Sequence, residues 1–307
     1  MSKQTLVRKI FHRNNILLAA LFLGFALPGG GQVLSAYTIY LLMIVMSFST
    51  TGLKLRMLTE IKSVGKITFD AAMLNYLIFG ALILIPAYFF LDEALFLGFV
   101  VIAATPPGVA IIPFTHIYNG DLDYSFKGIL GTFLLSIVLT PLIIGIFAQE
   151  AEVAPVQLVL LIVKVIVLPI AVSRLLTIKK IYPTVEKMRG RVVDFGFALI
   201  IYTAVAVNSQ VILANPQSIL GPVIILFVGI FLSAFVFEWI NLHSKNKKRN
   251  ISRNLFLTIK SSGFSIATAL ALFKEDPMST VPAAVLSIFV LLYLIAANHY
   301  FDRKEGK

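Results

Sequence analysis

Two lysines lie deep inside stretches of the chain that are otherwise apolar, and these side chains are the best placed to do chemistry. Lys164 stands in VLLIVKVIVLPI and Lys260 in LFLTIKSSGFSIA. Each is about eight to ten residues from the polar flanks of its stretch, which is ~12–15 Å along a helix. Because a lysine near the centre of a bilayer costs at least ~2.5–3.5 kcal/mol to insert, each is expected to face a cavity or a partner.

We predict that Lys260 binds a substrate or an ion, and we predict the same role for Lys164. Two structural alternatives stay open for Lys260: a buried ion pair with Asp70 or Glu238, or a side chain that extends to the cytoplasmic face. No carboxylate lies comparably deep in an apolar stretch. This pattern favours an anionic substrate or a lysine that exchanges protons, and it disfavours a simple cation carrier.

Helix-breaking residues interrupt two of the apolar stretches at corresponding places. The interruptions consist of Thr105, Pro106, Pro107 and Gly108 in one stretch, and of Lys260, Ser261, Ser262 and Gly263 in the other. Adjacent prolines remove backbone donors and cost ~3 kcal/mol or more inside a helix. A break exposes N–H groups and carbonyls with partial charges, which lipid cannot satisfy. We therefore predict a polar centre that binds ions or a charged substrate, with a purely structural kink as the alternative.

Other polar side chains in the apolar stretches are fewer and less specific. Asn75 and Asn208 could line a substrate path, although such residues also serve as packing contacts between membrane helices. The chain has no cysteine and four histidines, which are scattered toward the ends of apolar stretches. We therefore predict no catalytic residue, no metal site and no cofactor other than a coupling ion, which would be sodium or a proton.

Ten helices of membrane-spanning length are needed to position these residues. We predict them over roughly 15–28, 35–53, 67–91, 94–118, 123–148, 154–175, 192–212, 218–242, 252–273 and 278–300. The expected fold class is an all-α polytopic membrane protein in which 1–150 and 151–307 form two five-helix repeats. An odd number of helices in each repeat gives the second repeat the opposite orientation, so the repeats are inverted.

Composition and charge support a membrane location. Hydrophobic residues make up 58% of the chain, charged residues 13%, and the mean hydropathy is +0.91. The net charge of +11 is not taken as a nucleic-acid footprint, because nearly all Lys and Arg residues fall in loops on one side of the predicted helices. By the positive-inside rule that side is cytoplasmic. We expect a multi-pass protein of the inner cell membrane with both termini in the cytoplasm and the lipid bilayer as its surroundings.

Two sequence segments resemble the bile acid:sodium symporter family. ATPPGVAIIPFTHIYNGD, followed by Thr140-Pro141, is similar to the break in that family's fourth helix and to its fifth helix. IKSSGFSIATALAL is similar to the break in its ninth helix. The resemblance implies a panel domain of helices 1, 2, 6 and 7, a core domain of the other six with broken helices 4 and 9 crossing in it, and alternating-access transport of small organic anions.

The chain departs from that family where sodium would bind. Ile111 and Ile112 stand where the family usually has Ser-Asn, and Ile129 stands where a hydroxyl would help hold sodium. Phe256 takes the place of a carboxylate, and Lys260 that of a glutamine. The resemblance therefore implies degenerate sodium sites, in which the Lys260 ammonium replaces the cation or couples protons to transport.

Three other functions are considered. A drug/metabolite-type transporter also has ten helices in two inverted halves, but it does not call for paired broken helices. An intramembrane enzyme would need a signature such as His-Glu-x-x-His or Gly-x-Ser-x-Gly, and the chain has neither. A channel would share the apolar helices, and concentrative uptake would distinguish a carrier from it.

Overall fold

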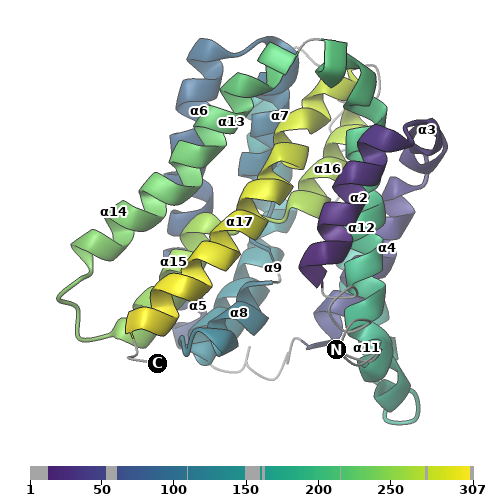
Figure 1. Ribbon diagram of the computed structural model, residues 1–307. Coiled ribbons are helices and arrows are strands. Elements are labelled where there is room, and N and C mark those ends of the chain that lie inside the picture. Colours follow the sequence, from purple (N-terminus) through teal and green to yellow (C-terminus); the bar gives the residue numbers. More distant parts are fainter. Residues whose placement is uncertain are drawn as a thin grey trace, which may run out of the picture.

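The structure is a computed structural model that describes residues 13–52, 61–108, 110–148, 160, 163–214, 216–273 and 276–304, and within these it is all-helical (Figure 1). The helices of the first half are α2 (Arg13–Ala26), α3 (Gly29–Ser35), α4 (Thr38–Ser49), α5 (Ile61–Ala72), α6 (Phe79–Phe90), α7 (Glu93–Ala104), α8 (Ile111–Ile117) and α9 (Leu122–Phe147). Those of the second half are α11 (Leu168–Leu176), α12 (Tyr182–Ala214), α13 (Leu220–Phe227), α14 (Ser233–Ile240), α15 (Lys247–Thr258), α16 (Ser262–Leu272) and α17 (Val281–Lys304).

Short helical turns of other types join or interrupt these helices. Three are π-helical: η3 (Met73–Ile78) between α5 and α6, η5 (Val163–Val167) before α11, and η7 (Val228–Leu232) between α13 and α14. Three are 3-10 turns: η1 (Thr50–Gly52), η6 (Pro216–Ile219) and η8 (Pro277–Thr280). Two of the π-helical turns contain residues that were predicted to bind a substrate or an ion, Asn75 in η3 and Lys164 in η5. Such turns are frequent at functional sites.

Four continuous helical segments are long and apolar enough to cross a membrane. They are 62–90, 122–147, 182–210 and 216–240. A fifth span is possible if α2 and α3, which meet at an angle of 113°, are taken as one. Shorter apolar helices cover 38–52, 93–104, 262–272 and 278–294. The chain is therefore a helical membrane protein, while the count of ten spans and the inverted repeat stay predictions.

The helices form two groups that lie side by side in Figure 1. Helices α2, α3 and α4 pack against the long α12, α11 packs against α4, and the remaining helices form the rest of the bundle. Helix α2 begins and α17 ends toward the same, lower side of the bundle in that view. The assignment of these groups to moving panel and core domains stays a prediction.

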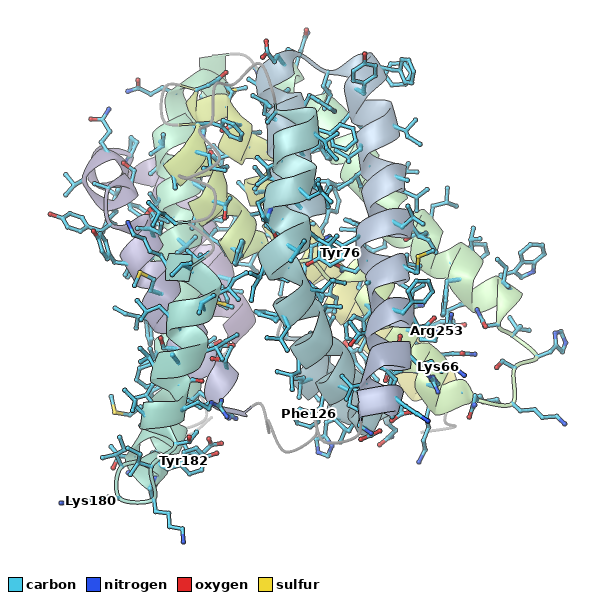
Figure 2. All side chains as sticks on the ribbon, turned by 180° about the vertical axis from the view of Figure 1, so that it is seen from behind. Lys66, Tyr76, Phe126, Lys180, Tyr182 and Arg253 are labelled. Carbon is cyan, nitrogen blue, oxygen red and sulfur yellow. The ribbon has the colours of Figure 1, made fainter. Side chains whose placement is uncertain are left out.

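Some helix boundaries differ from those expected. The long helix α12 begins at Tyr182 rather than near residue 192, because its first turns are polar and hydropathy detects only the apolar part. An ion pair between Arg189 and Glu186, 3.0 Å apart, lies on this polar extension and joins side chains one turn apart. A helix was predicted over 154–175. Its part before residue 163, except residue 160, lies outside the described residues. Figure 2 shows Lys180 and Tyr182 at the extreme end of the molecule and Lys66 toward the same end.

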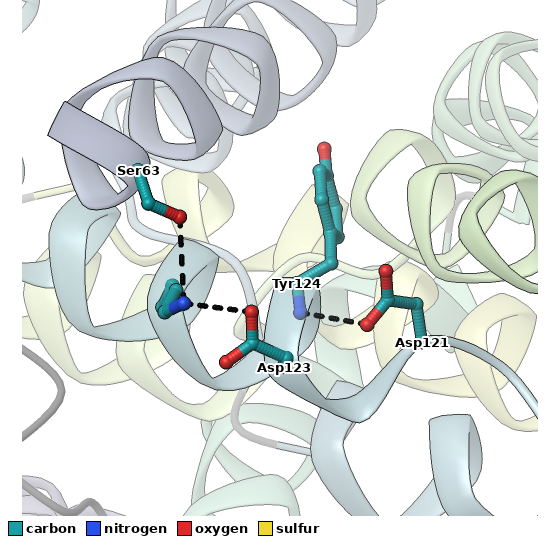
Figure 3. Close-up of polar contacts among 5 residues, drawn as sticks. Ser63, Asp121, Asp123 and Tyr124 are labelled. Atoms are coloured by element: carbon teal, nitrogen blue, oxygen red, sulfur yellow. Dashed lines mark hydrogen bonds and ion pairs between the residues drawn. The ribbon is translucent and has the colours of Figure 1, made fainter. Parts of the chain in front are cut away.

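Polar contacts fix the start of α9 (Figure 3). The Asp121 carboxylate caps the helix by accepting a hydrogen bond from the Tyr124 backbone N–H at 3.0 Å. The buried Lys127 ammonium lies 2.7 Å from Asp123 Oδ2 and donates to Ser63 Oγ of α5 at 3.4 Å. Capping carboxylates stabilise helix N-termini, so these contacts hold α9 in place against α5.

A second polar cluster ties α15 to α5 and α9. Arg253 Nη2 donates to Asp70 Oδ1 at 2.9 Å, and Arg253 Nε lies 2.9 Å from Asp70 Oδ2. The Tyr124 hydroxyl donates to the same carboxylate at 2.8 Å. This cluster fixes the position of α15 just before the break that follows it.

The packing of α9 on α5 gives a stability prediction. A Cβ at Gly131 would lie 1.7 Å from Thr68 Oγ1. So close an approach places the overpacking cost of Gly131→Ala in the upper part of the usual range, ~2–3 kcal/mol, which exceeds the ~1 kcal/mol that alanine gains over glycine in a helix. We expect a lower midpoint of thermal unfolding in detergent. Gly145→Ala on the same helix, where nothing lies within 4 Å, is the matched control and should unfold no lower than the parent. Equal midpoints for the two variants would contradict this packing.

Candidate functional site

Two non-helical segments lie side by side at the centre of this site. Helix α7 ends at Ala104 and α8 begins at Ile111, while α15 ends at Thr258 and α16 begins at Ser262. Pro107 and Lys260 form an antiparallel β-bridge. Gly108 N donates to Ile259 O at 3.1 Å, and Ser261 N donates to Pro106 O at 3.3 Å. Each segment thus supplies the backbone partners that the other would otherwise lack inside a membrane.

Local sequence explains why the first segment leaves the helix and approaches the second so closely. Thr105 precedes Pro106 and takes an extended conformation, φ −77° and ψ 151°, as expected for a residue before proline. Prolines at 106 and 107 cannot donate hydrogen bonds to the preceding turn. A Cβ at Gly108 would lie 3.1 Å from Ile259 Cγ2 and 3.2 Å from Lys260 O, so a glycine there allows the two backbones to meet.

The Lys260 side chain is almost completely buried, with 2% of its surface exposed. Its Nζ donates to the carbonyl of Thr105 at 2.7 Å and to that of Ala103 at 2.9 Å. The same nitrogen lies 4.5 Å from the centre of the Tyr76 ring, a cation–π arrangement. Figure 2 shows Tyr76 near mid-height of the helical bundle. The ammonium therefore binds the carbonyl end of α7.

These contacts show that both structural alternatives considered for Lys260 are wrong. Its ammonium forms no ion pair with Asp70, which binds Arg253, and Glu238 instead accepts a hydrogen bond from Asn254 at 3.0 Å. The side chain is also not extended toward a surface, because it is buried against α7. The sequence favoured acidic partners because charged side chains can be identified in a sequence. A backbone carbonyl is present in every residue, so the sequence cannot indicate that those of α7 lie near Lys260.

The last carbonyls of α7 are all satisfied, three of them by side chains. Thr105 Oγ1 donates to Ile102 O at 2.9 Å, and Thr140 Oγ1 of α9 donates to Ala104 O at 2.7 Å. Lys260 serves the carbonyl of Ala103 that lies between them. The carboxyl end of a helix carries partial negative charge, so this group of oxygens is suited to hold a cation, and the tethered ammonium supplies one.

A cavity of about 60 Å³ lies beside the two breaks. Ser261, Ser262 and Gly263 at the start of α16 line it together with Gly108. The facing walls come from Leu17 of α2, Phe197 and Ile201 of α12, and the α17 residues Ser287, Val290, Leu291 and Leu294. Ala103, Thr105 and Tyr76, which surround the Lys260 ammonium, are not among the lining residues. Lys260 itself is among the lining residues, while its Nζ binds the carbonyls of Ala103 and Thr105.

One protein-family model matches residues 15–300 of the chain. The chain belongs to the SBF-like CPA transporter family (DUF4137). Comparison with curated proteins finds no significant match. Membership of this family, together with the apolar helices, makes the protein a membrane transporter, and a transporter family fits a protein that is not an enzyme.

In this member of the SBF-like CPA transporter family, apolar side chains occupy the positions at which the sequence predicts that sodium has lost its oxygen ligands. Ile111, Ile129 and Phe256 are fully buried in the hydrophobic core. The Phe256 ring packs edge-on against Tyr124, with centroids 5.6 Å apart. Ile112 packs partly buried against the same core. None of these side chains offers an oxygen to sodium, which favours oxygen ligands.

The structure brings only some of the other predicted residues to the crossing. Asn75, in the π-helical turn η3, is buried and its Nδ2 donates to Phe256 O at 2.9 Å, close to the second break. Asn208 is buried elsewhere: its Nδ2 donates to Ala204 O at 2.8 Å and to Thr280 Oγ1. Lys164 lines a different cavity. Asn75 thus supports the site, whereas Asn208 acts as a contact between α12 and η8.

Sequence reasoning missed several groups that build the site. Tyr76 adjoins Asn75, and its aromatic ring inside an apolar stretch carried no signal of a cation contact. The Ser265 hydroxyl, 2.9 Å from Thr105 Oγ1, stood in the quoted ninth-helix segment without a role. Phe197 and Ile201 belong to a different group of helices and could be placed at the cavity only by the tertiary structure.

Proposed function

We propose that this protein is a secondary active carrier of small organic anions in the cell membrane, working by alternating access. In this proposal the two breaks belong to discontinuous spans, α7–α8 and α15–α16, which cross in a ten-span fold of two inverted repeats with both termini in the cytoplasm. Paired interrupted helices that meet at a binding site are typical of secondary transporters. Family membership and the paired breaks beside a cavity support this function.

The contact of the Lys260 ammonium with the carbonyls of Ala103 and Thr105 carries the proposal. A carbonyl cluster at a helix end would bind a metal cation, whose charge a symporter uses to hold its site in the binding conformation. Here a covalently attached ammonium supplies that charge. Since the positions of Ile111, Ile129 and Phe256 supply no side-chain oxygens, we propose that transport does not depend on sodium.

The cavity beside the breaks is suited to an anion with an apolar portion. The first turn of α16 opens onto it, and the N-terminal end of a helix carries partial positive charge. The hydroxyls of Ser261 and Ser262 add polar groups, Phe197 and Ile201 add apolar walls, and no carboxylate lines the cavity. Its small volume in this conformation is consistent with a site that enlarges when α12 and α2 move relative to α16.

Replacing sodium with choline tests this function. In proteoliposomes offered a panel of radiolabelled monocarboxylates and sulfonates of graded size, we expect concentrative uptake of at least one anion, changed less than about twofold by the replacement. An imposed proton gradient, with and without an uncoupler, shows whether protons drive the uptake. Strict sodium dependence would contradict the role given to Lys260. Uptake that only equilibrates the anion across the membrane would indicate a channel.

A further inference from the structure

A second and larger cavity lies on the other half of α16. It has a volume of about 440 Å³ and shares no lining residue with the cavity beside the breaks. Its walls come from α16, from the α3–α4 segment, and from the chain around η5: Ala267 and Leu270–Leu272; Ser35, Ala36 and Thr38–Tyr40; and Leu160 and Lys164. The walls come from both predicted repeats, so a relative movement of the two groups of helices would change its shape.

Among the described residues, Lys164 supplies the only charged side chain on the walls of this cavity. It is exposed, and no hydrogen bond or ion pair connects it to another residue in the part of the chain that the structure describes. Val165 and Ile166, which follow it, are buried in the core. Its backbone lies in the π-helical turn η5 (Val163–Val167), a distortion that often marks functional positions. An unpaired ammonium in an apolar segment calls for an anionic partner.

The other polar groups of the cavity restrict what that partner can be. Ser35 Oγ donates to Gln32 O at 2.7 Å, and Thr38 Oγ1 donates to Leu34 O at 3.0 Å. A hydroxyl has one hydrogen to donate, so neither can also donate to an anion. Lys164 is left as the charged donor, with the Tyr40 hydroxyl as a further polar group, and the remaining lining is mostly aliphatic. One ammonium above an aliphatic wall fits a single negative charge on an apolar body.

We propose that the Lys164 cavity is a vestibule that binds the monoanionic head of an amphipathic organic anion before it reaches the crossing of the two breaks. The proposal rests on the proposed function for its place in the transport cycle. Helix α16 connects the two cavities, since Ser261–Gly263 line one, and Ala267 and Leu270–Leu272 line the other. At ~1.5 Å per residue they are ~6–17 Å apart along the helix, a distance that one flexible anion can cover.

The test is an equilibrium binding measurement that needs no transport. The chain has no cysteine, so Ser35→Cys places a single thiol at the wall of the cavity. In nanodiscs of phosphatidylcholine, we expect decanoate to slow modification of this thiol by N-ethylmaleimide at least fivefold, and uncharged decanol to leave the rate unchanged. Lys164→Gln should abolish the protection and Lys164→Arg should retain it. A thiol introduced at Gly145, in an open position on α9, should be unaffected by decanoate.

Three outcomes would overturn the proposal. Equal protection by decanoate and decanol would indicate a purely apolar groove. Protection that survives Lys164→Gln would remove the lysine from the site. Full protection in nanodiscs of phosphatidylglycerol without decanoate would indicate a lipid headgroup site. Because the protection is measured without a gradient, a protein that transports no anion but shows Lys164-dependent protection would contradict the proposed function and leave the binding site standing.

Discussion

Replacing Lys260 with alanine is expected to abolish transport, lowering the uptake rate at least ~100-fold, which corresponds to about 2.7 kcal/mol, while the protein still folds. The variant leaves the buried carbonyls of Ala103 and Thr105 without their donor, and an unsatisfied buried acceptor costs ~1–3 kcal/mol. It also removes the positive charge that the carbonyl end of α7 requires. Uptake in proteoliposomes, alongside thermal unfolding of the same preparation, measures both effects.

Two further variants separate the charge of Lys260 from its volume. Lys260→Met keeps a long side chain in the buried space but has no charge, so it is expected to be as inactive as the alanine variant and closer to the parent in unfolding temperature. In Lys260→Ala, added methylammonium should restore part of the uptake by entering the vacated position, and it should not affect the methionine variant. Parent-like uptake by Lys260→Met would show that the ammonium has no role in transport.

Gly263→Ala is the second substitution expected to have a large effect. The added Cβ would lie 2.4 Å from Cδ1 and 2.5 Å from Cε1 of Phe197, at the contact between α16 and α12 beside the cavity. Such overpacking costs ~1–3 kcal/mol. If the contact exists in one conformation of the transport cycle and not in the other, the equilibrium between them shifts by about 5–150-fold, and uptake should fall by a comparable factor.

The control for Gly263→Ala is relief of the clash from the other side. Phe197→Ala also removes a wall of the cavity and is measured first as its own reference. Adding Gly263→Ala to Phe197→Ala should then lower uptake much less than Gly263→Ala lowers it in the parent. Gly65→Ala, where no atom lies within 4 Å of the new Cβ, should transport at the parent rate. An unchanged uptake rate for Gly263→Ala would show that α16 and α12 do not move against each other at this contact.

Much of the local structure could be predicted because it depends on neighbouring residues. Thr105-Pro106-Pro107-Gly108 and Lys260-Ser261-Ser262-Gly263 stand in apolar stretches, and the chain is non-helical at Thr105–Gly108 and at Ile259–Ser261. Proline lacks the backbone donor that a helix needs, and this property can be read from the sequence alone. The similarity of these segments to a transporter family also agreed with the family to which the chain belongs.

Other expectations failed or stay untested for reasons that are also physical. The start of α12 was placed too late because a helix can continue into water with polar turns. Asn208 was grouped with the site by its depth in an apolar stretch; its amide contacts Thr280 of η8, and its place on a substrate path stays a prediction. The number of spans, their orientation and the transported anion stay predictions. They depend on how the protein interacts with a membrane and a ligand, and not only on neighbouring residues in the chain.

The amino-acid sequence by itself determined that this protein lies in a membrane, where its helices are interrupted, and that two lysines stand deep inside apolar stretches. These features follow from the solvent preference and backbone chemistry of contiguous residues. Only the tertiary structure decided what each lysine meets. The carbonyls that bind Lys260 lie 155 and 157 residues away in the chain, and every residue type has such a carbonyl, so folding alone selects which of them receives the ammonium.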